Sequence, residues 1–167
     1  MNMMTKETDI YSVVVLSVKA ACFENEEKLS MNTFFELAES RYSVRKFEER
    51  EIEEDQLERI LRAGQIAPTG ANRQPQRIFV LQSPEAIEKV RSLTRYAFNA
   101  PTVLLICADF DDAWTGVDGH NCAVTDAVIV ITHMMLAAWD EGIGSCWVRG
   151  FEKNITHTSQ PNSYVKH

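Results

Sequence analysis

The sequence has few cysteines, glycines and prolines, and no uninterrupted apolar run is long enough to cross a membrane. Its 167 residues include 4 cysteines, 7 glycines and 5 prolines. This usage excludes a disulfide-dense secreted scaffold, a collagen-like repeat and a Gly/Pro-rich disordered chain. The most apolar short stretch, Ile10 to Val18, has about half of the ~20 residues that a membrane-spanning helix needs.

Basic residues are also in short supply. The chain has 17 Lys and Arg against 24 Asp and Glu, which gives a formal net charge of -7. Nucleic-acid binders instead gather Lys and Arg into patches. Glu7 and Asp9 precede the apolar stretch, where a secretory signal has basic residues, and no cysteines form a CxxC pair. We therefore expect a cytoplasmic protein with reduced thiols that engages neither nucleic acids nor membranes.

The length of the chain and its 45% hydrophobic content are typical of one globular domain. From Met31 onward the pattern predicts a compact α+β domain that ends at Asn154. We expect residues 1–30 to form a poorly packed N-terminal extension and residues 155–167 to form an irregular C-terminal tail.

Capping residues mark the starts of three predicted helices. The first begins at Thr33, the second has acidic residues at Glu53 to Asp55 in its first turn and stops at Pro68, and the third begins at Ser83 with Pro84 at its first position. The inner side of the first helix is expected to carry four apolar residues, namely Phe34, Phe35, Leu37 and Ala38.

Apolar segments predict the middle of the fold. Arg77 to Gln82 and Cys146 to Phe151 are typical of strands, and Thr102 to Ala108, which is apolar on both sides, is typical of a central strand. A long helix between about Asn121 and Glu141 is apolar on nearly every face, with Gly142 as its left-handed cap. Such a helix belongs in the interior of the domain.

A short basic segment is the first candidate for chemistry. If residues 41–47 are extended, then Arg41, Ser43 and Arg45 project to the same side. Two guanidinium groups that flank a hydroxyl suit a phosphate monoester, because each can donate two parallel hydrogen bonds to its oxygens. The alternative is a surface strand whose arginines pair with nearby carboxylates.

A turn-rich loop from Ala67 to Pro75 is the second candidate. Its small residues allow a flat ligand to approach the backbone. The side-chain amides of Asn72 and Gln74 can donate and accept hydrogen bonds at the edge of a heteroaromatic ring. The alternative is an ordinary connection, since Pro, Gly and Asn are common in all loops.

The third candidate is the segment from Gly142 to Phe151. It is not a dinucleotide-binding GxGxxG motif, because Trp147 stands where that motif needs glycine, and it contains no GxSxG nucleophile motif. Any contribution to a site would come from its backbone amides. The nearby Asp118, His120 and Cys122 lack the fourth ligand of a closed zinc site, so no metal site is predicted.

Taken together, the three segments resemble the nitroreductase family of flavin enzymes. The order RxSxR(K)F, APxxxNxQP and a long apolar helix that ends in GxGxxWxxGF runs from about Met31 to Lys153. The resemblance implies a mainly antiparallel sheet sandwiched by helices, and a homodimer that packs along the long central helices and holds FMN at its interface.

The resemblance also implies roles for individual residues. Arg41, Ser43 and Arg45 match binders of the FMN phosphate and ribityl chain, and Tyr42 contributes through its backbone. Residues of the loop that reaches over the flavin from the partner subunit correspond to Pro68, Thr69, Gly70 and Asn72. The strand whose backbone amide points at flavin N5 corresponds to Trp147, Val148, Arg149 and Gly150.

The implied activity is transfer of hydride from NADH or NADPH through FMN to small flat acceptors such as nitroaromatics or quinones. Both substrates would use one slot on the flavin, so ping-pong kinetics are expected and no catalytic acid or base is named. Two alternatives stay open. One is a flavin-binding but catalytically weak truncated homologue, and the other is a non-enzymatic dimeric interaction protein.

The C-terminal tail departs from the family pattern. Chains of the family continue past the strand that begins at Cys146 with a further helix, a basic residue for the phosphate and an arm that wraps the partner. Residues 155–167 match none of these. We therefore expect a C-terminally shortened member whose homodimer is weakened by the missing arm.

Overall fold

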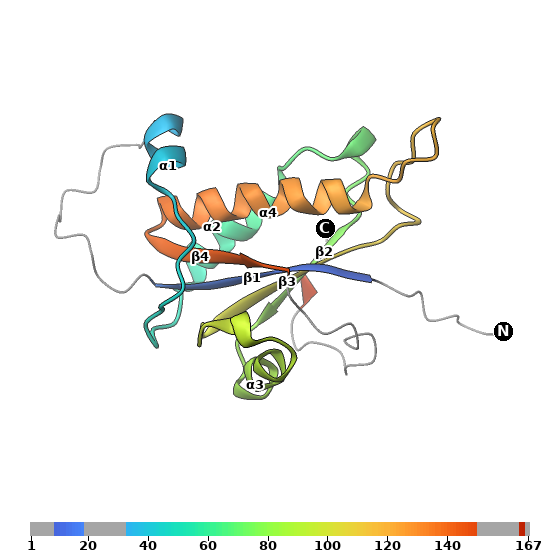
Figure 1. The fold of residues 1–167 in the computed structure, drawn as a ribbon. Helices are drawn as coiled ribbons and strands as arrows, with labels where there is room; N and C mark the ends of the chain where they lie inside the picture. Colours follow the sequence, from blue (N-terminus) through green and yellow to red (C-terminus); the bar gives the residue numbers. More distant parts are fainter. Residues whose placement is uncertain (1–8, 19–32, 150–163, 166–167) are drawn as a thin grey trace.

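A five-stranded sheet with helices on both faces forms the framework of the protein (Figure 1). The computed structural model describes residues 9–18, 33–149 and 164–165. The strands are β1 (Asp9–Val18), β2 (Gln76–Leu81), β3 (Thr102–Ala108), β4 (Ile143–Val148) and β5 (Tyr164–Val165). The helices are α1 (Phe34–Ser40), α2 (Glu54–Gln65), α3 (Pro84–Leu93) and α4 (Ala123–Asp140), with 3-10 turns η1 (Gly70–Asn72) and η2 (Arg95–Ala97).

The order of the strands is β4-β1-β3-β2-β5, and every pair of neighbours is antiparallel. Helices α2 and α4 cover one face of the sheet, and α3 covers the other (Figure 1). Each face has its own core, with Leu104 and Ile106 of β3 facing α4 and Val103 facing α3. The α+β fold and the central position of β3 are therefore as the sequence predicts.

The starts and ends of the helices follow local chemistry. Thr33 forms a capping box with Glu36, and the hydroxyl of Ser83 accepts a hydrogen bond from the backbone of Ala86 at the start of α3. Gly142, which follows α4, has a φ of 75°, a value at which a side chain would be strained. By length and composition α4 could cross a membrane, but core helices pass the same test, and α4 packs against both α2 and the sheet.

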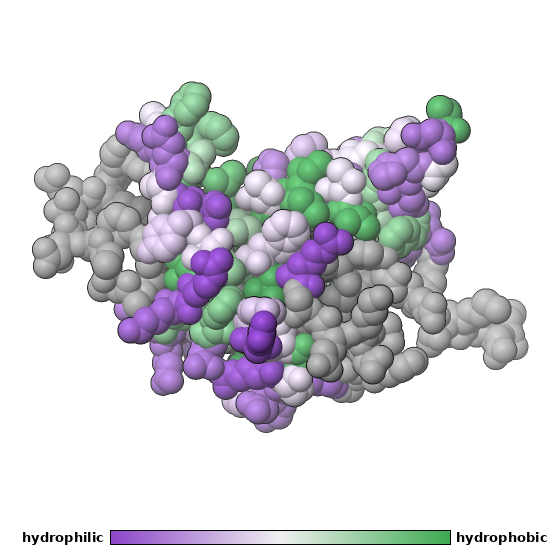
Figure 2. Space-filling view, in the orientation of Figure 1, coloured by the Kyte–Doolittle hydropathy of each residue, from purple (hydrophilic) through white to green (hydrophobic). Residues whose placement is uncertain are grey.

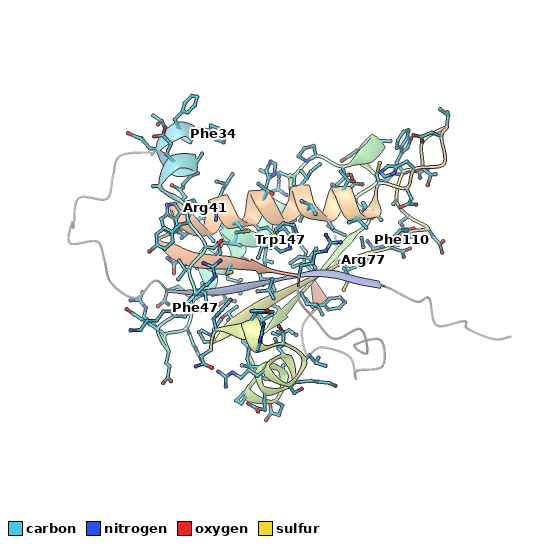
Figure 3. All side chains as sticks on the ribbon, viewed as in Figure 1. Phe34, Arg41, Phe47, Arg77, Phe110 and Trp147 are labelled. Carbon is cyan, nitrogen blue, oxygen red and sulfur yellow. The ribbon has the colours of Figure 1, made fainter. Side chains whose placement is uncertain are left out.

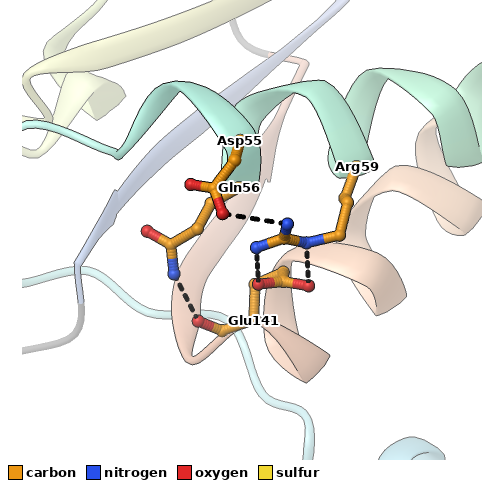
Figure 4. A network of polar contacts seen from close by, with 4 residues as sticks. All are labelled: Asp55, Gln56, Arg59 and Glu141. Atoms are coloured by element: carbon orange, nitrogen blue, oxygen red, sulfur yellow. Dashed lines mark hydrogen bonds and ion pairs between the residues drawn. The ribbon is translucent and has the colours of Figure 1, made fainter.

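A polar network joins α2 to the C-terminal end of α4 (Figure 4). The guanidinium of Arg59 donates two hydrogen bonds to the carboxylate of Glu141, at 2.6 and 2.8 Å, and a third to Asp55 at 3.0 Å. The side-chain amide of Gln56 donates to the backbone carbonyl of Glu141 at 3.0 Å. These contacts fix the turn from which β4 begins.

Helix α1 does not bury the four apolar side chains that were expected on its inner side. Phe34 and Phe35 are 67% and 73% exposed, and α1 has no buried residue. The prediction of an inner side was wrong because, in the part of the chain that the structure describes, this short helix packs against the end of α4 and does not cover the sheet. Its polar contact with the rest of the domain is at the end of α4, where Trp139 Nε1 donates to Ser40 Oγ at 2.9 Å.

The N-terminal region also differs from the expectation of a poorly packed extension. Residues 9–18 form β1, which lies between β4 and β3 and pairs with both. The β-branched residues Val13 to Val15 explain why this segment forms a strand. In the C-terminal tail, Tyr164 and Val165 pair with β2. The other residues of the predicted extension and tail lie outside the described ranges.

Burial of a thiol makes the stability of the fold sensitive to alkaline pH. Cys107 of β3 is 3% exposed, and burial raises the pKa of its thiol from 9.0 to about 12. Since the folded-state pKa is the higher one, the stabilisation is complete below pH 9.0 and is lost as the pH rises through about 12. We expect this group to lower the free energy of unfolding by up to about 1.4 kcal/mol per pH unit above its unfolded pKa.

Urea unfolding of the wild type and Cys107→Ala at about pH 8 and about pH 10 measures this contribution. The difference in stability between the two proteins should narrow at the higher pH. Val103→Ala, which truncates a buried apolar side chain of the same strand and removes no thiol, is the matched control, and its difference in stability from the wild type should be the same at both pH values. Equal pH slopes in wild type and Cys107→Ala would contradict the prediction.

Candidate functional site

The basic segment at residues 41–45 lies along the edge strand β4. The backbone N–H of Val44 donates to the carbonyl of Ser145 at 3.0 Å, and Ser43 and Ser145 form a parallel bridge. A Cβ on Gly144 would lie 2.8 Å from Cγ2 of Val44, so the absence of a side chain allows this close approach. The segment is therefore extended and held against the sheet.

The side chains of Arg41, Ser43 and Arg45 gather around one point on β4. Burial raises the pKa of the Cys146 thiol, whereas the positive charge of Arg45, a hydrogen bond from Ser43 and the positive charge of Arg41 oppose this rise. All three side chains thus act on the same sulfur atom. Alternation along an extended chain predicts that these three side chains also project to one side of the segment.

Arg41 has a side-chain donor with no partner among the described residues. Its Nη1 atom is buried and makes no hydrogen bond to any described residue. Arg45 is exposed, and its Nη1 reaches the carbonyl of Ser43 at 3.5 Å. Because a buried guanidinium nitrogen without an acceptor is costly, the segment is suited to bind an anion. The ring of Tyr42 packs edge-on against Trp139, with ring centroids 5.0 Å apart. The ring therefore points toward α4, and only the backbone of Tyr42 is placed to contribute alongside the arginines.

The third predicted segment lies next to the first. Trp147 and Val148 belong to β4, Trp147 is 41% exposed, and Arg149 follows the strand and is exposed. Backbone groups of alternate residues point to the same edge of a strand, so those of Trp147 point the same way as the Ser145 carbonyl that binds Val44. Figure 3 shows Arg41 and Trp147 on neighbouring parts of the fold. Gly150 lies outside the described residues.

The loop at residues 67–75 is tightly constrained. Ala71, Asn72 and Gln74 have φ values of 48°, 53° and 49°, in the left-handed region that side chains disfavour. The hydroxyl of Thr69 accepts from the backbone N–H of Gln74 at 3.0 Å. Pro68 and Asn72 are exposed, whereas Thr69, Gly70 and Gln74 are half-buried.

This loop is separated from the basic segment within the chain. Arg41 lies near the C-terminal end of α4, whereas η1 and the labelled Arg77 lie toward its N-terminal end (Figures 1 and 3). An α-helix of this length measures about 27 Å. One chain therefore brings the first and third predicted segments together, but not the second.

Sequence reasoning missed two residues that shape these segments. Gly144 admits Val44, and Asp126 of α4 accepts a hydrogen bond from the backbone of Gly70 at 2.9 Å. Asp126 carries a readable signal, because it is the one acidic residue between Ala123 and Trp139. Gly144 carries no such signal, because the sequence does not show which residue packs against a glycine in a strand.

Asp118, one of the residues considered for a metal, has a structural role in a turn. The carboxylate of Asp118 accepts from the backbone N–H of His120 at 3.0 Å within an exposed hairpin. Among the residues with described side chains there is no group of three or more His, Cys, Asp or Glu that could hold a metal ion.

Comparison with known proteins relates this geometry to one family. The model of the nitroreductase family matches residues 38–96 and 94–159. The solved structure of a nitroreductase family protein from Clostridium difficile 630 is 43% identical, and the match covers 72% of this chain and 70% of that chain with a TM-score of 0.70. An FMN-dependent nitroreductase from Clostridium difficile R20291 is 26% identical, with 66% and 62% covered and a TM-score of 0.57.

A curated relative from Methanothermobacter thermautotrophicus has the proposed name NADH dehydrogenase/NAD(P)H nitroreductase. It is 28% identical over 123 residues, which are 72% of this chain and 62% of that protein. The chain thus spans slightly less than two thirds of the length of this relative.

Proposed function

The chain belongs to the nitroreductase family, and from this premise we propose that it is an FMN-dependent oxidoreductase. Its electron donor would be NADH or NADPH, and its acceptors would be small flat molecules such as nitroaromatics or quinones. The names of two related proteins, an FMN-dependent nitroreductase and an NADH dehydrogenase/NAD(P)H nitroreductase, support the cofactor and the donor.

One observation carries the proposal. The buried Nη1 of Arg41 has no acceptor among the described residues, and it lies in the segment that also presents Ser43 and Arg45 around Cys146. A phosphate monoester would supply the missing acceptor and would satisfy both guanidinium groups. The donor set of this chain therefore fits the phosphate end of FMN.

The remaining tasks of the protein are binding and orientation. Bound FMN supplies a ring that accepts hydride from a nicotinamide and passes electrons to an acceptor. Arg41, Ser43 and Arg45 would hold the phosphate, and the backbone at Trp147 to Arg149 would offer hydrogen-bond donors along the same sheet edge. No side chain is assigned as a general acid or base, because positioning the ring within reach of both substrates is sufficient.

We propose that the loop at residues 67–75 acts on the flavin of a partner subunit. Within one chain the loop is separated from the arginines along α4, so a second copy is needed to complete the site. The outer side of α4 offers a surface for that copy, since Val124, Val128 and Leu136 are only half-buried. Figure 2 shows apolar surface along this helix, and buried apolar area is what drives association.

Titration of the purified full chain with FMN tests the proposal. We expect quenching of flavin fluorescence on binding, loss of the flavin absorbance on adding NADH or NADPH without oxygen, and its return on adding a quinone. Binding without this cycle would favour a catalytically weak flavin protein. A dimer that does not bind FMN would favour a non-enzymatic interaction protein, and either result would overturn the proposed activity.

A further inference from the structure

Asp126 is a buried carboxylate with few partners. It lies in the first turn of α4 and is 2% exposed. Its Oδ1 accepts the backbone N–H of Gly70 at 2.9 Å, whereas its Oδ2 has no partner in the part of the chain that is described. The positive end of the helix dipole offsets some of the cost of the charge. A carboxylate with one hydrogen bond is still a poor choice for stability alone.

The hydrogen bond from Gly70 reaches a strained part of the loop. Gly70 precedes Ala71 and Asn72, which both have positive φ values. A Cβ on Gly70 would lie 3.1 Å from Cβ of Trp114 and 3.6 Å from Oδ2 of Asp126, so the backbone packs tightly against the start of α4. Without an acceptor at position 126, the loop would have less reason to keep this conformation.

We propose that Asp126 is a positioning residue, which fixes Gly70 so that the loop presents Asn72 to the flavin. The inference rests on the proposed function, because it assumes that the loop contacts FMN. It explains why a largely apolar helix has one buried acidic residue. The carboxylate of Asp126 fixes the conformation of the loop and contributes little to the stability of the fold.

Two variants separate positioning from stability. Asp126→Ala removes the acceptor together with the poorly paired charge, so we expect an unchanged or higher melting temperature and FMN binding weakened about 10- to 100-fold. Asp126→Asn keeps a side-chain oxygen that can accept from Gly70, so its affinity for FMN should stay within about threefold of wild type. Fluorescence titration and thermal unfolding without flavin give the two readouts.

A core variant on the same helix is the matched control. Val130 is fully buried in α4, so Val130→Ala should lower the melting temperature and leave FMN affinity unchanged. If Asp126→Ala loses stability and affinity together, or binds FMN like the wild type, the positioning role is overturned. Loss of affinity in Asp126→Asn equal to that in Asp126→Ala would overturn it too.

Hydrogen exchange at the amide of Gly70 tests the inference without flavin. Asp126→Ala should speed this exchange, while amides in the middle of α4 keep their wild-type rates. Unchanged exchange at Gly70 would overturn the inference. Failure of the wild-type chain to bind FMN would instead overturn the proposed function, so the two failures are distinguishable.

Discussion

Replacing Arg41 and Arg45 together by alanine is expected to weaken FMN binding by about 3 to 6 kcal/mol, or roughly 10²- to 10⁴-fold. Each guanidinium would lose charge-assisted hydrogen bonds worth about 1.5 to 3 kcal/mol. Arg41 should account for the larger share, because its Nη1 is buried and unpaired among the described residues, whereas Arg45 is exposed to screening solvent. Fluorescence titration of the single and double variants measures the loss.

Two controls make this result specific to the phosphate. Arg62→Ala combined with Arg91→Ala removes the same charge from exposed positions on α2 and α3, and it should bind FMN like the wild type. Riboflavin, which lacks the phosphate, should bind equally to the wild type and to the Arg41→Ala/Arg45→Ala protein. Wild-type FMN affinity in the double variant would reject the phosphate assignment.

A mixture of two defective subunits is expected to regain FMN binding. One subunit carries Arg41→Ala and Arg45→Ala, and the other carries Gly70→Val, whose side chain would collide with Trp114 and displace the loop. If the loop acts on the flavin of the partner, each mixed dimer has one site with both parts intact. Random pairing makes about half of the dimers mixed, so about one quarter of all sites should bind FMN like the wild type.

Coexpression with two affinity tags allows the mixed dimers to be purified and their flavin content to be measured. Each defective protein alone should hold little FMN under the same conditions. If arginines and loop served the same flavin within one chain, the mixture would show no recovery. Failure to recover any mixed dimer would contradict the proposed homodimer.

Local chemistry explains which parts of the fold could be predicted from the sequence. Thr33, Ser83 and Gly142 mark helix ends through hydrogen bonds or backbone angles that depend on a few adjacent residues. The segment from Thr102 to Ala108 is buried on both faces because it is apolar on both, which a single strand already reveals. The joint projection of Arg41, Ser43 and Arg45 likewise follows from alternation within one strand-like segment.

The features that could not be predicted depend on contacts between distant segments. Phe34 and Phe35 have a buried-helix pattern, but nothing lies beneath them in the described fold, so they are exposed. The role of Gly144 depends on Val44, which is a hundred residues away. Residues 9–18 pair with both β3 and β4. This could not be predicted from the sequence, because it depends on β3 and β4 not pairing with each other.

The placement of β1 has a consequence for how substitutions should be tolerated. In the described sheet, the edge strand β4 meets the other strands only through β1. The N-terminal strand contains none of the predicted ligand-binding residues. Its hydrogen bonds to β3 and β4 nevertheless hold β4, and the segment at residues 41–45 that pairs with β4, in place relative to the core. A proline in the middle of residues 9–18 would remove hydrogen bonds of this ladder and would disturb β4 together with the segment at residues 41–45 that pairs with it. Substitutions in β1 should therefore be poorly tolerated, although this strand contains no residue that is predicted to bind the cofactor.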